Sequence, residues 1–485
     1  MSAATLLLIA AGGIAVLLMM VIKFKINAFI ALLMVSIGVA LAAGVPAGEL
    51  VDTIQEGMGQ TLGYIAIIIA LGAMVGRMIE MSGGARSFAH SLIDRFGERR
   101  TPLALTVAGF VLGIPIFFDV GLIILMPIVV GVARVSRKPI LLYALPLAGA
   151  MLTVHALLPP HPGPVALAGL IGADQGMMLL FGLPIAAVVT VLGFLLARRM
   201  TRREYPMDPE LYERVYGGTT APDVDGSGGT STPATDGGKA ESGGGGTAVL
   251  APAVGETQQA ERPPSFGMIL TMVLTPIVLI MCGSVASTTL ADGSPVRTVL
   301  GVLGAPMTAL LIAVVLCAYF LGVRRGWSAT RIEEVLGSAL PPVALVILVS
   351  GAGGIFGKVL VKTGIGDAVS EVLQASGLPL LTLAFLMTLV LRAAQGSATV
   401  ALVTVGGVLA PLLKDVDLSS PRLALVALAM GGGALALSHI NDSGFWMFTK
   451  LVGLNVATAL RTWTVLTTGM GLSAFALAAA VWPLV

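Results

Sequence analysis

Long apolar runs, separated by short polar or basic segments, follow one another from the start of the chain to its end. A helix that crosses the hydrocarbon core of a bilayer needs about 20 such residues. The runs therefore predict transmembrane helices, at residues 4–22, 27–43, 61–80, 176–197, 267–288, 298–322, 338–360 and 462–483. The first run has no charged segment before it and no small-residue cleavage site, so we interpret it as a retained span rather than a signal peptide.

Two further apolar segments, residues 101–133 and 378–413, are interrupted near their middle. Basic residues flank both ends of the first segment, and such residues favour the cytoplasmic side of a membrane. Each of its arms has about 14 residues, or roughly 21 Å of α-helix, which is too short to cross. We therefore predict a re-entrant helical hairpin with Phe118 and Asp119 at its tip. The second segment is interpreted in the same way, with its tip at residues 393–399.

Another pair of segments, residues 140–173 and 421–459, predicts two broken spans. In the first, five of the ten residues 155–164 are Pro or Gly and two are His. Pro has no N–H and its ring collides with the preceding turn, so a helix cannot run straight through this stretch. In lipid, each unsatisfied backbone group costs several kcal/mol, so the break must line a cavity or be buried in protein.

A shift of 281 residues aligns the two halves of the chain. Residues 72–83 then fall on residues 353–364, and Gly163 falls on Gly444. The first broken span thereby gains a counterpart at residues 438–444, and the tips of the two hairpin segments correspond as well. These matches in one register predict an internal repeat.

Charge indicates that the two repeats face opposite ways. The loop at residues 84–100 carries four Arg, whereas its counterpart at residues 365–381 carries none. Inverted repeats with paired broken helices are typical of secondary transporters that bind substrate near the middle of the bilayer. We therefore predict inverted repeats at residues 1–197 and 267–485. Residues 198–266, rich in Gly, Ser, Thr and Ala, are interpreted as a flexible cytoplasmic linker.

The composition indicates an all-α polytopic membrane protein without a water-facing catalytic domain of any size. Of the 485 residues, 56% are apolar and 11% are charged, against about 25% charged in soluble proteins. Cys282 and Cys317 lie in separate apolar runs and are expected to pack between helices. The sequence has no His-Glu-x-x-His pair and no Ser with a His at a nucleophile spacing. We expect no enzyme activity, no metal or other cofactor, and no nucleic-acid partner.

The four breaks contain groups that suit a small organic anion with several hydroxyls. Helix N-termini carry free N–H groups and partial positive charge, and they bind carboxylates. Side-chain hydroxyl, amide and imidazole groups at the breaks add hydrogen-bonding partners for substrate hydroxyls. The candidate substrate-binding residues are Phe118, Asp119, His155, His161, Gly163, Gln395, Gly396, Ser397, Thr399, Ser438, His439, Asn441, Ser443 and Gly444.

Three ionisable residues at the predicted breaks are candidates for proton coupling: Asp119, Asp442 and His155. Such groups inside a membrane are functional candidates by default. Each also has a structural interpretation, as a network carboxylate, as the cap of the helix that follows, or as a buried histidine held by hydrogen bonds. Arg392, just before the second tip, is a candidate for attracting an anion, whereas Arg77 is expected to reach toward the membrane surface.

Four stretches of the chain resemble the bacterial gluconate permease family of gluconate:proton symporters, which belongs to a wider superfamily of ion transporters. They are Leu-Ile-Asp-Arg-Phe-Gly-Glu at 92–98, Gly-Ile-Pro-Ile-Phe-Phe-Asp-Val-Gly at 113–121, Val-His-Ala-Leu-Leu-Pro-Pro-His-Pro-Gly-Pro at 154–164, and Ser-His-Ile-Asn-Asp at 438–442. The resemblance implies proton-coupled uptake of gluconate or a related sugar acid by an elevator-type mechanism. Two features depart from the family pattern, because Asp119 stands where Glu is common and the linker is long and rich in Gly.

The resemblance and the charge pattern together predict about ten transmembrane helices plus two re-entrant hairpins in the bacterial plasma (inner) membrane. Both termini are expected outside, with the linker in the cytoplasm. The partners are then a gluconate-like anion, the proton and the lipid bilayer, and a homodimer stays open by analogy with related scaffolds. Three alternatives stay open as well: a symporter for D-serine or a dicarboxylate, a passive organic-anion channel, and an intramembrane hydrolase.

Overall fold

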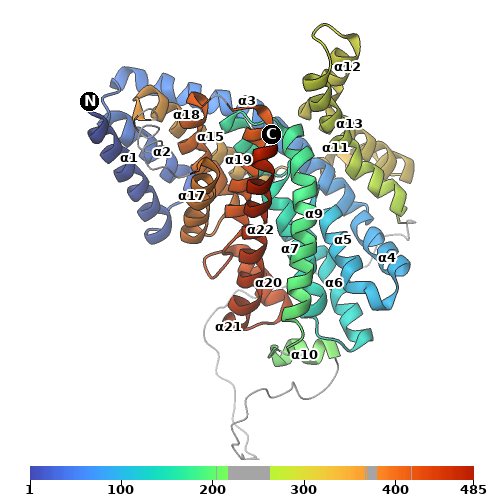
Figure 1. The fold of residues 1–485 in the computed structure, drawn as a ribbon. Coiled ribbons are helices and arrows are strands. Elements are labelled where there is room, and N and C mark those ends of the chain that lie inside the picture. Colours follow the sequence, from blue (N-terminus) through green and yellow to red (C-terminus); the bar gives the residue numbers. More distant parts are fainter. Residues whose placement is uncertain (204, 217–262, 366–367, 369–378, 417) are drawn as a thin grey trace, which may run out of the picture.

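The computed structural model describes residues 1–203, 205–216, 263–365, 368, 379–416 and 418–485. These residues fold into helices, and no β-strand forms among them. Nine of the described helices are long and apolar enough to cross a membrane. The predicted all-α, polytopic class is therefore confirmed (Figure 1).

The predicted interruptions divide the chain where the sequence places Pro, Gly and polar residues. The two hairpin segments and the two broken spans become four pairs of helices: α5 (Thr101–Gly113) and α6 (Phe118–Ser136), α17 (Leu380–Gln395) and α18 (Ala398–Asp415), α7 (Leu141–Leu157) and α8 (Pro162–Ile171), and α19 (Ser420–Leu435) and α20 (Ser443–Val452). Helices α18 and α20 begin 280 and 281 residues after α6 and α8, which agrees with the shift found in the sequence. The opposite orientation of the two halves stays a prediction.

Other helices surround these four pairs. They are α1 (Ala3–Leu18), α2 (Ala28–Ala42), α3 (Ala47–Met81), α4 (Gly84–Phe96), α9 (Gln175–Met200), α10 (Pro209–Tyr216), α11 (Phe266–Thr289), α12 (Pro295–Gly304), α13 (Pro306–Cys317), α14 (Ala329–Gly337), α15 (Pro341–Lys362), α21 (Val456–Ala459) and α22 (Val465–Val481). The span expected at 298–322 is in fact broken, because Ala305 separates α12 from α13.

Helix α3 has 35 residues, or about 52 Å of rise, and is longer than one bilayer crossing. We predicted that this span begins at residue 61, but most of residues 44–60 form the first turns of α3. Contacts with α15 explain the difference. Lys358 and Lys362 of α15 bind the carboxylates of Glu56 and Glu49, in both cases at 2.8 Å. These partners are far apart in sequence, so the local pattern could not reveal them.

Two cores of buried apolar side chains hold the described helices together. The smaller core is formed mainly by α1, α2, α3 and α15. The larger core is formed by helices that include α5, α7, α9, α19 and α22. Helices α8 and α18 send apolar side chains into both cores, so the helices that begin at two of the breaks lie where the cores meet.

The segment after α9 packs against the protein, which corrects the predicted start of the linker. Helix α9 extends to Met200 rather than ending at residue 197, and residues 209–216 form α10. Val215 in α10 is fully buried. The rest of the predicted linker, residues 217–262, lies outside the described residues.

Helix α10 connects two loops that are distant in sequence. The Tyr216 hydroxyl donates to the carbonyl oxygen of Lys138 (2.8 Å) and accepts from the N–H of Ile140 (2.9 Å), both in the loop between α6 and α7. Just before α10, the N–H of Asp208 donates to the carbonyl oxygen of Gly453 (2.8 Å), which follows α20. The segment therefore ties the first half of the chain to the second.

Replacing Tyr216 by Phe removes both hydroxyl bonds and should loosen α10. The loss of about 1–2 kcal/mol predicts roughly 5- to 30-fold faster hydrogen exchange in residues 209–216. Tyr212→Phe is the matched control, because its hydroxyl has no hydrogen bond among the described residues. Equal exchange in both variants would show that the Tyr216 hydroxyl does not hold α10.

The same helix should respond to alkaline pH. Burial raises the pKa of Tyr216, which means that the folded protein holds the hydroxyl proton more tightly than the unfolded chain does. The stability that the protonated Tyr216 hydroxyl contributes is therefore fully present below pH about 10, the ordinary Tyr pKa. It is lost as the pH rises through the higher pKa of Tyr216 in the folded protein. Hydrogen exchange in residues 209–216 should accelerate above that pH, beyond the intrinsic effect of base, in the native protein but not in Tyr216→Phe.

Candidate functional site

The first hairpin touches both broken spans. The carbonyl oxygen of Gly113, at the end of α5, accepts a hydrogen bond from Nε2 of His161 at 2.5 Å, directly before α8. At the start of α20, a Cβ built on Gly444 would lie 3.3 Å from the ring of Phe118 in α6. The start of α6 is therefore in van der Waals range of the start of α20.

The second hairpin closes the ring of contacts. A Cβ on Gly163, at the start of α8, would lie 3.4 Å from Thr399 in α18. Gly396 has a φ of +83°, and a Cβ there would collide with the carbonyl oxygen of Asn441. Only Gly permits both this backbone conformation and this close approach. The starts of α6, α8, α18 and α20 thus lie around one region.

A buried ion pair joins α17 to α20. The side chains of Arg392 and Asp442 are 2% and 8% exposed, and Nη2 lies 2.5 Å from Oδ2. Arg392 also donates to the carbonyl oxygens of Ala434 and Gly396. Asp442 accepts from the N–H of Gly444 at 2.9 Å and so caps α20. Arg392, which we considered for anion attraction, is therefore bound by groups of the protein itself. Asp442 caps the helix that follows it, which was the structural interpretation of this residue.

Ser438 and Trp463 complete this network. The hydroxyl of fully buried Ser438 donates to Asp442 and accepts from Nε1 of Trp463 at 2.7 Å. Trp463 lies in a π-helical turn (Leu460–Thr464), and its ring stacks on Phe448 with the ring centroids 4.6 Å apart. Because both bonds of its hydroxyl go to protein, Ser438 holds Asp442 in place. Trp463 was not among the residues predicted for the site, although a buried indole N–H usually finds an acceptor and so marks a candidate for such a network.

His155 and His161 form a chain of imidazoles in the first broken span. Their Nδ1 atoms lie 3.2 Å apart. Nε2 of His161 must donate to the carbonyl oxygen of Gly113, since that oxygen can only accept. In the neutral form, Nδ1 of His161 is then the acceptor and Nδ1 of His155 the donor. Nε2 of His155 is left as an acceptor, available to a substrate hydroxyl or to a proton.

Asp119 differs from Asp442 in having a free carboxylate. It lies in the first turn of α6, where the helix N-terminus stabilises negative charge. Its side chain is exposed and makes no hydrogen bond or ion pair within the described residues. Of the three proton-coupling candidates, Asp119 and His155 therefore keep free atoms, whereas Asp442 is bound to Arg392.

Two buried amide atoms lack partners among the described residues where the second hairpin meets the second broken span: Nε2 of Gln395 and Oδ1 of Asn441. The Asn441 amide is held in place, because its Nδ2 donates to the carbonyl oxygen of Ala393 at 2.6 Å. An unpaired buried polar atom costs about 1–3 kcal/mol, and a bound molecule that supplied the partner would remove this cost. One donor and one acceptor together suit an alcohol hydroxyl.

The remaining candidates stand at the helix starts. Oγ of Ser397 accepts from the N–H of Val400 at 3.3 Å, which caps α18 and leaves its own O–H free to donate. Ser443 is exposed at the first position of α20. His439 is partly exposed and its ring has no hydrogen bond within the described part of the chain. These residues stay candidates for substrate contact.

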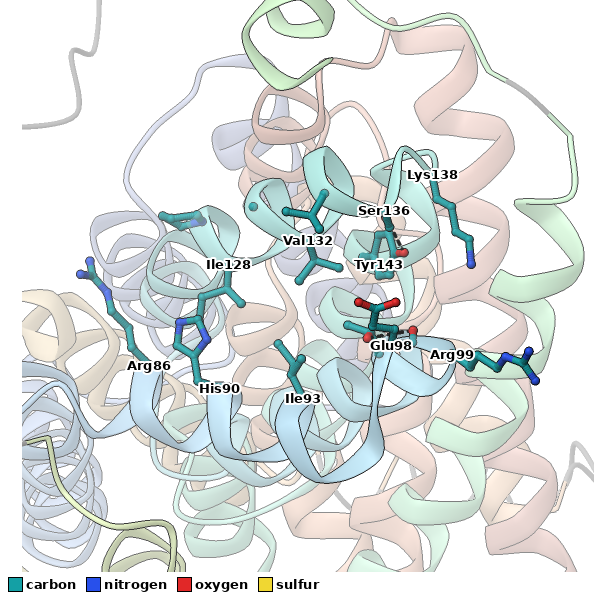
Figure 2. Close-up of a pocket in the computed structure, with 14 residues that line it drawn as sticks. Arg86, His90, Ile93, Glu98, Arg99, Ile128, Val132, Ser136, Lys138 and Tyr143 are labelled. Carbon is teal, nitrogen blue, oxygen red and sulfur yellow. Dashed lines mark hydrogen bonds between the residues drawn. The ribbon is translucent and has the colours of Figure 1, made fainter. Parts of the chain in front are cut away.

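Figure 2 shows a cavity of about 650 Å³ that lies elsewhere, between α4 and α6. His90 and Glu98 point into this region from α4 and the turn after it, and Arg86 lies at its edge. At its far wall the Tyr143 hydroxyl donates to Oγ of Ser136 at 2.9 Å. No residue predicted for substrate binding lines this cavity. The site at the breaks is therefore identified by its polar groups and not by the size of a cavity.

Comparison with known proteins places the chain among transporters. The model of the GntP family permease matches residues 4–223 and 248–485. The chain is 46% identical to the inner membrane permease YgbN of Escherichia coli K12 over the full length of both. It is 35% identical to the gluconate permease of Bacillus licheniformis, over 95% of this chain and 96% of that one. The crystal structure of the Alcanivorax borkumensis YdaH transporter is similar to this structure with a TM-score of 0.61 over 94% of this chain and 98% of that one. Because the two sequences are only 14% identical, this similarity shows the fold alone.

Asp442→Asn should destabilise the protein strongly, because Arg392 would stay buried without its carboxylate. We expect about 3–5 kcal/mol less stability, seen as a lower melting temperature of the purified protein. Adding Arg392→Met should restore part of the loss, with a coupling of about 1–3 kcal/mol in the double-mutant cycle. Asp119→Asn is the control and should melt like the native protein. Additive effects of the two substitutions would show that the pair does not stabilise the fold.

Proposed function

The chain belongs to the GntP family of permeases, and from this membership we propose that it is a secondary active transporter that carries gluconate, or a closely related sugar acid, into the cell together with protons. It is a multi-pass membrane protein of the inner membrane and a transporter rather than an enzyme. Gluconate comes from the printed names of relatives at 33–35% identity, such as the Bacillus licheniformis protein. The proton as the coupling ion is our own proposal.

The proposal is supported above all by one observation: four helix starts lie around one region, and unpaired polar atoms of Gln395 and Asn441 lie at the ends of the neighbouring segments. We propose that the substrate carboxylate lies against the N-termini of α18 and α20, near Ser397 and Ser443. Hydroxyls along the sugar chain would then meet Gln395, Asn441 and Nε2 of His155. An apolar molecule would leave these atoms unsatisfied, which favours a polyhydroxy acid.

Asp119 and His155 are proposed to carry the proton. Both have free atoms at the site, and protonation of either leaves the hydrogen bonds around it intact. His155 accepts a proton at Nε2 while its Nδ1 still donates to His161. Protonating Asp442 would instead disrupt its pair with Arg392. We therefore assign Asp442 to holding the second hairpin in position.

Alternating access is proposed to follow an elevator-type movement of two inverted repeats, residues 1–197 and 267–485. The equal spacing of the paired breaks supports the repeat. The meeting of two cores at α8 and α18 supports a movement of one group of helices against the other. By the charge pattern, we propose that both termini face outside and that the segment after α9 faces the cytoplasm.

Uptake into proteoliposomes tests the proposed function directly. Labelled gluconate should accumulate above its outside concentration when the lumen is made alkaline, and accumulation should collapse when a protonophore removes the pH gradient. A passive anion channel would only equilibrate the label. Accumulation that needs a sodium gradient and ignores the pH gradient would contradict proton coupling, and an absence of gluconate uptake with accumulation of D-serine or citrate would contradict the substrate.

Asp119→Asn tests the proton carrier. This variant keeps the shape of the side chain but cannot take up a proton, so accumulation driven by the pH gradient should fall by about 10-fold or more. Exchange of labelled for unlabelled gluconate at equal pH should fall much less, because exchange requires no net proton movement. Full gradient-driven accumulation by Asp119→Asn would remove this residue from the coupling mechanism.

A further inference from the structure

A second cavity, of about 150 Å³, reaches the outer side of the first hairpin. One wall is α3, with Gly76, Arg77 and Glu80. The facing wall is the turn between α5 and α6 together with Val120. The start of α15 forms the third side, with Ser338 just before it. We call this cavity the α3 cleft.

One aromatic side chain lies next to both the α3 cleft and the site at the breaks. Phe117 lines the cleft, and its ring centroid lies 6.1 Å from that of His161. Gly76 allows α3 to contact this turn directly, because a Cβ there would collide with the carbonyl oxygen of Pro115. A molecule that left the site past Phe117 would therefore enter the α3 cleft.

Arg77 is the cation that lines the α3 cleft among the described residues. Its Nη1 lies 2.6 Å from a carboxylate oxygen of Glu80, and its Nε donates to Oγ of Ser338 at 2.9 Å. A guanidinium has five N–H donors, so three stay available. The side chain is 31% exposed, which is enough for contact with a solute. Most other lining residues, from Ala73 to Pro342, are apolar and strengthen electrostatic attraction in the cleft.

We propose that the α3 cleft is a transit site for the substrate anion and that Arg77 binds the carboxylate there. This inference rests on the proposed function, since it concerns the route of the same organic anion. Glu80 neutralises Arg77 when the cleft is empty, and the substrate carboxylate replaces Glu80 as the partner during passage. Competition by Glu80 keeps the anion from being retained. This proposal gives Arg77 a role beyond the expected reach toward the membrane surface.

The test measures the KM for gluconate from each face of the membrane, with intact cells for one face and inside-out vesicles for the other. Arg77→Gln should raise the KM at the face that opens to the α3 cleft by about 3- to 10-fold, and leave the opposite KM within about twofold. In the native protein that KM should rise with ionic strength, and the rise should be absent in Arg77→Gln. Arg77→Lys should keep the KM at the cleft-side face close to the native value, because the positive charge is retained. Glu80→Gln should lower the KM at the same face.

Lys358→Gln is the matched control. Lys358 in α15 also forms an ion pair, with its Nζ 2.8 Å from a carboxylate oxygen of Glu56 in α3, but it does not line the α3 cleft. Its KM at the cleft-side face should stay native. An unchanged KM in Arg77→Gln, or an equal change at both faces, would overturn the transit site while native gluconate uptake persists. Absence of gluconate transport by the native protein would instead overturn the proposed function itself.

Discussion

The guanidinium of Arg392 satisfies two helix ends and holds the cap of a third helix, and the second half of the site depends on it. A helix that stops inside a membrane leaves backbone groups without partners, and lipid supplies none. Arg392 donates to the carbonyl oxygens of Ala434 and Gly396, at the ends of α19 and α17. It also pairs with Asp442, which caps α20. One buried side chain therefore allows the chain to be interrupted twice without exposed polar backbone.

The first half meets the same requirement with different chemistry. There the end of α5 is satisfied by His161, which in turn is bound by His155. Hydrogen-bonded imidazoles stand here where the second half has an ion pair. The two halves thus satisfy their interrupted helices with different chemistry, an imidazole pair on one side and a buried salt bridge on the other.

The positions of the four paired breaks could be predicted from sequence, because Pro, Gly and polar residues in apolar runs act locally on the helix. The break at Ala305 between α12 and α13 was not predicted. The partners of each side chain could not be predicted. Arg392 was a plausible anion attractor until its contacts with Asp442 and two carbonyl oxygens were known. The predicted α3 was shorter than the observed helix, and the predicted linker began before the observed end of the folded segment. Both features depend on contacts with residues distant in the chain, as in Lys358–Glu56 and Tyr216–Lys138.

The docking of α10 has a consequence for how this sequence can change over time. Tyr216 fixes the chain on one side of residues 217–262, and Phe266 fixes it on the other by stacking on Phe88 with the ring centroids 4.6 Å apart. The match to the family stops at residue 223 and resumes at 248, between these two anchors. Residues held by their own contacts therefore lie on both sides of this interval, so a tag or reporter domain inserted there would join the protein at two points that are fixed independently of it.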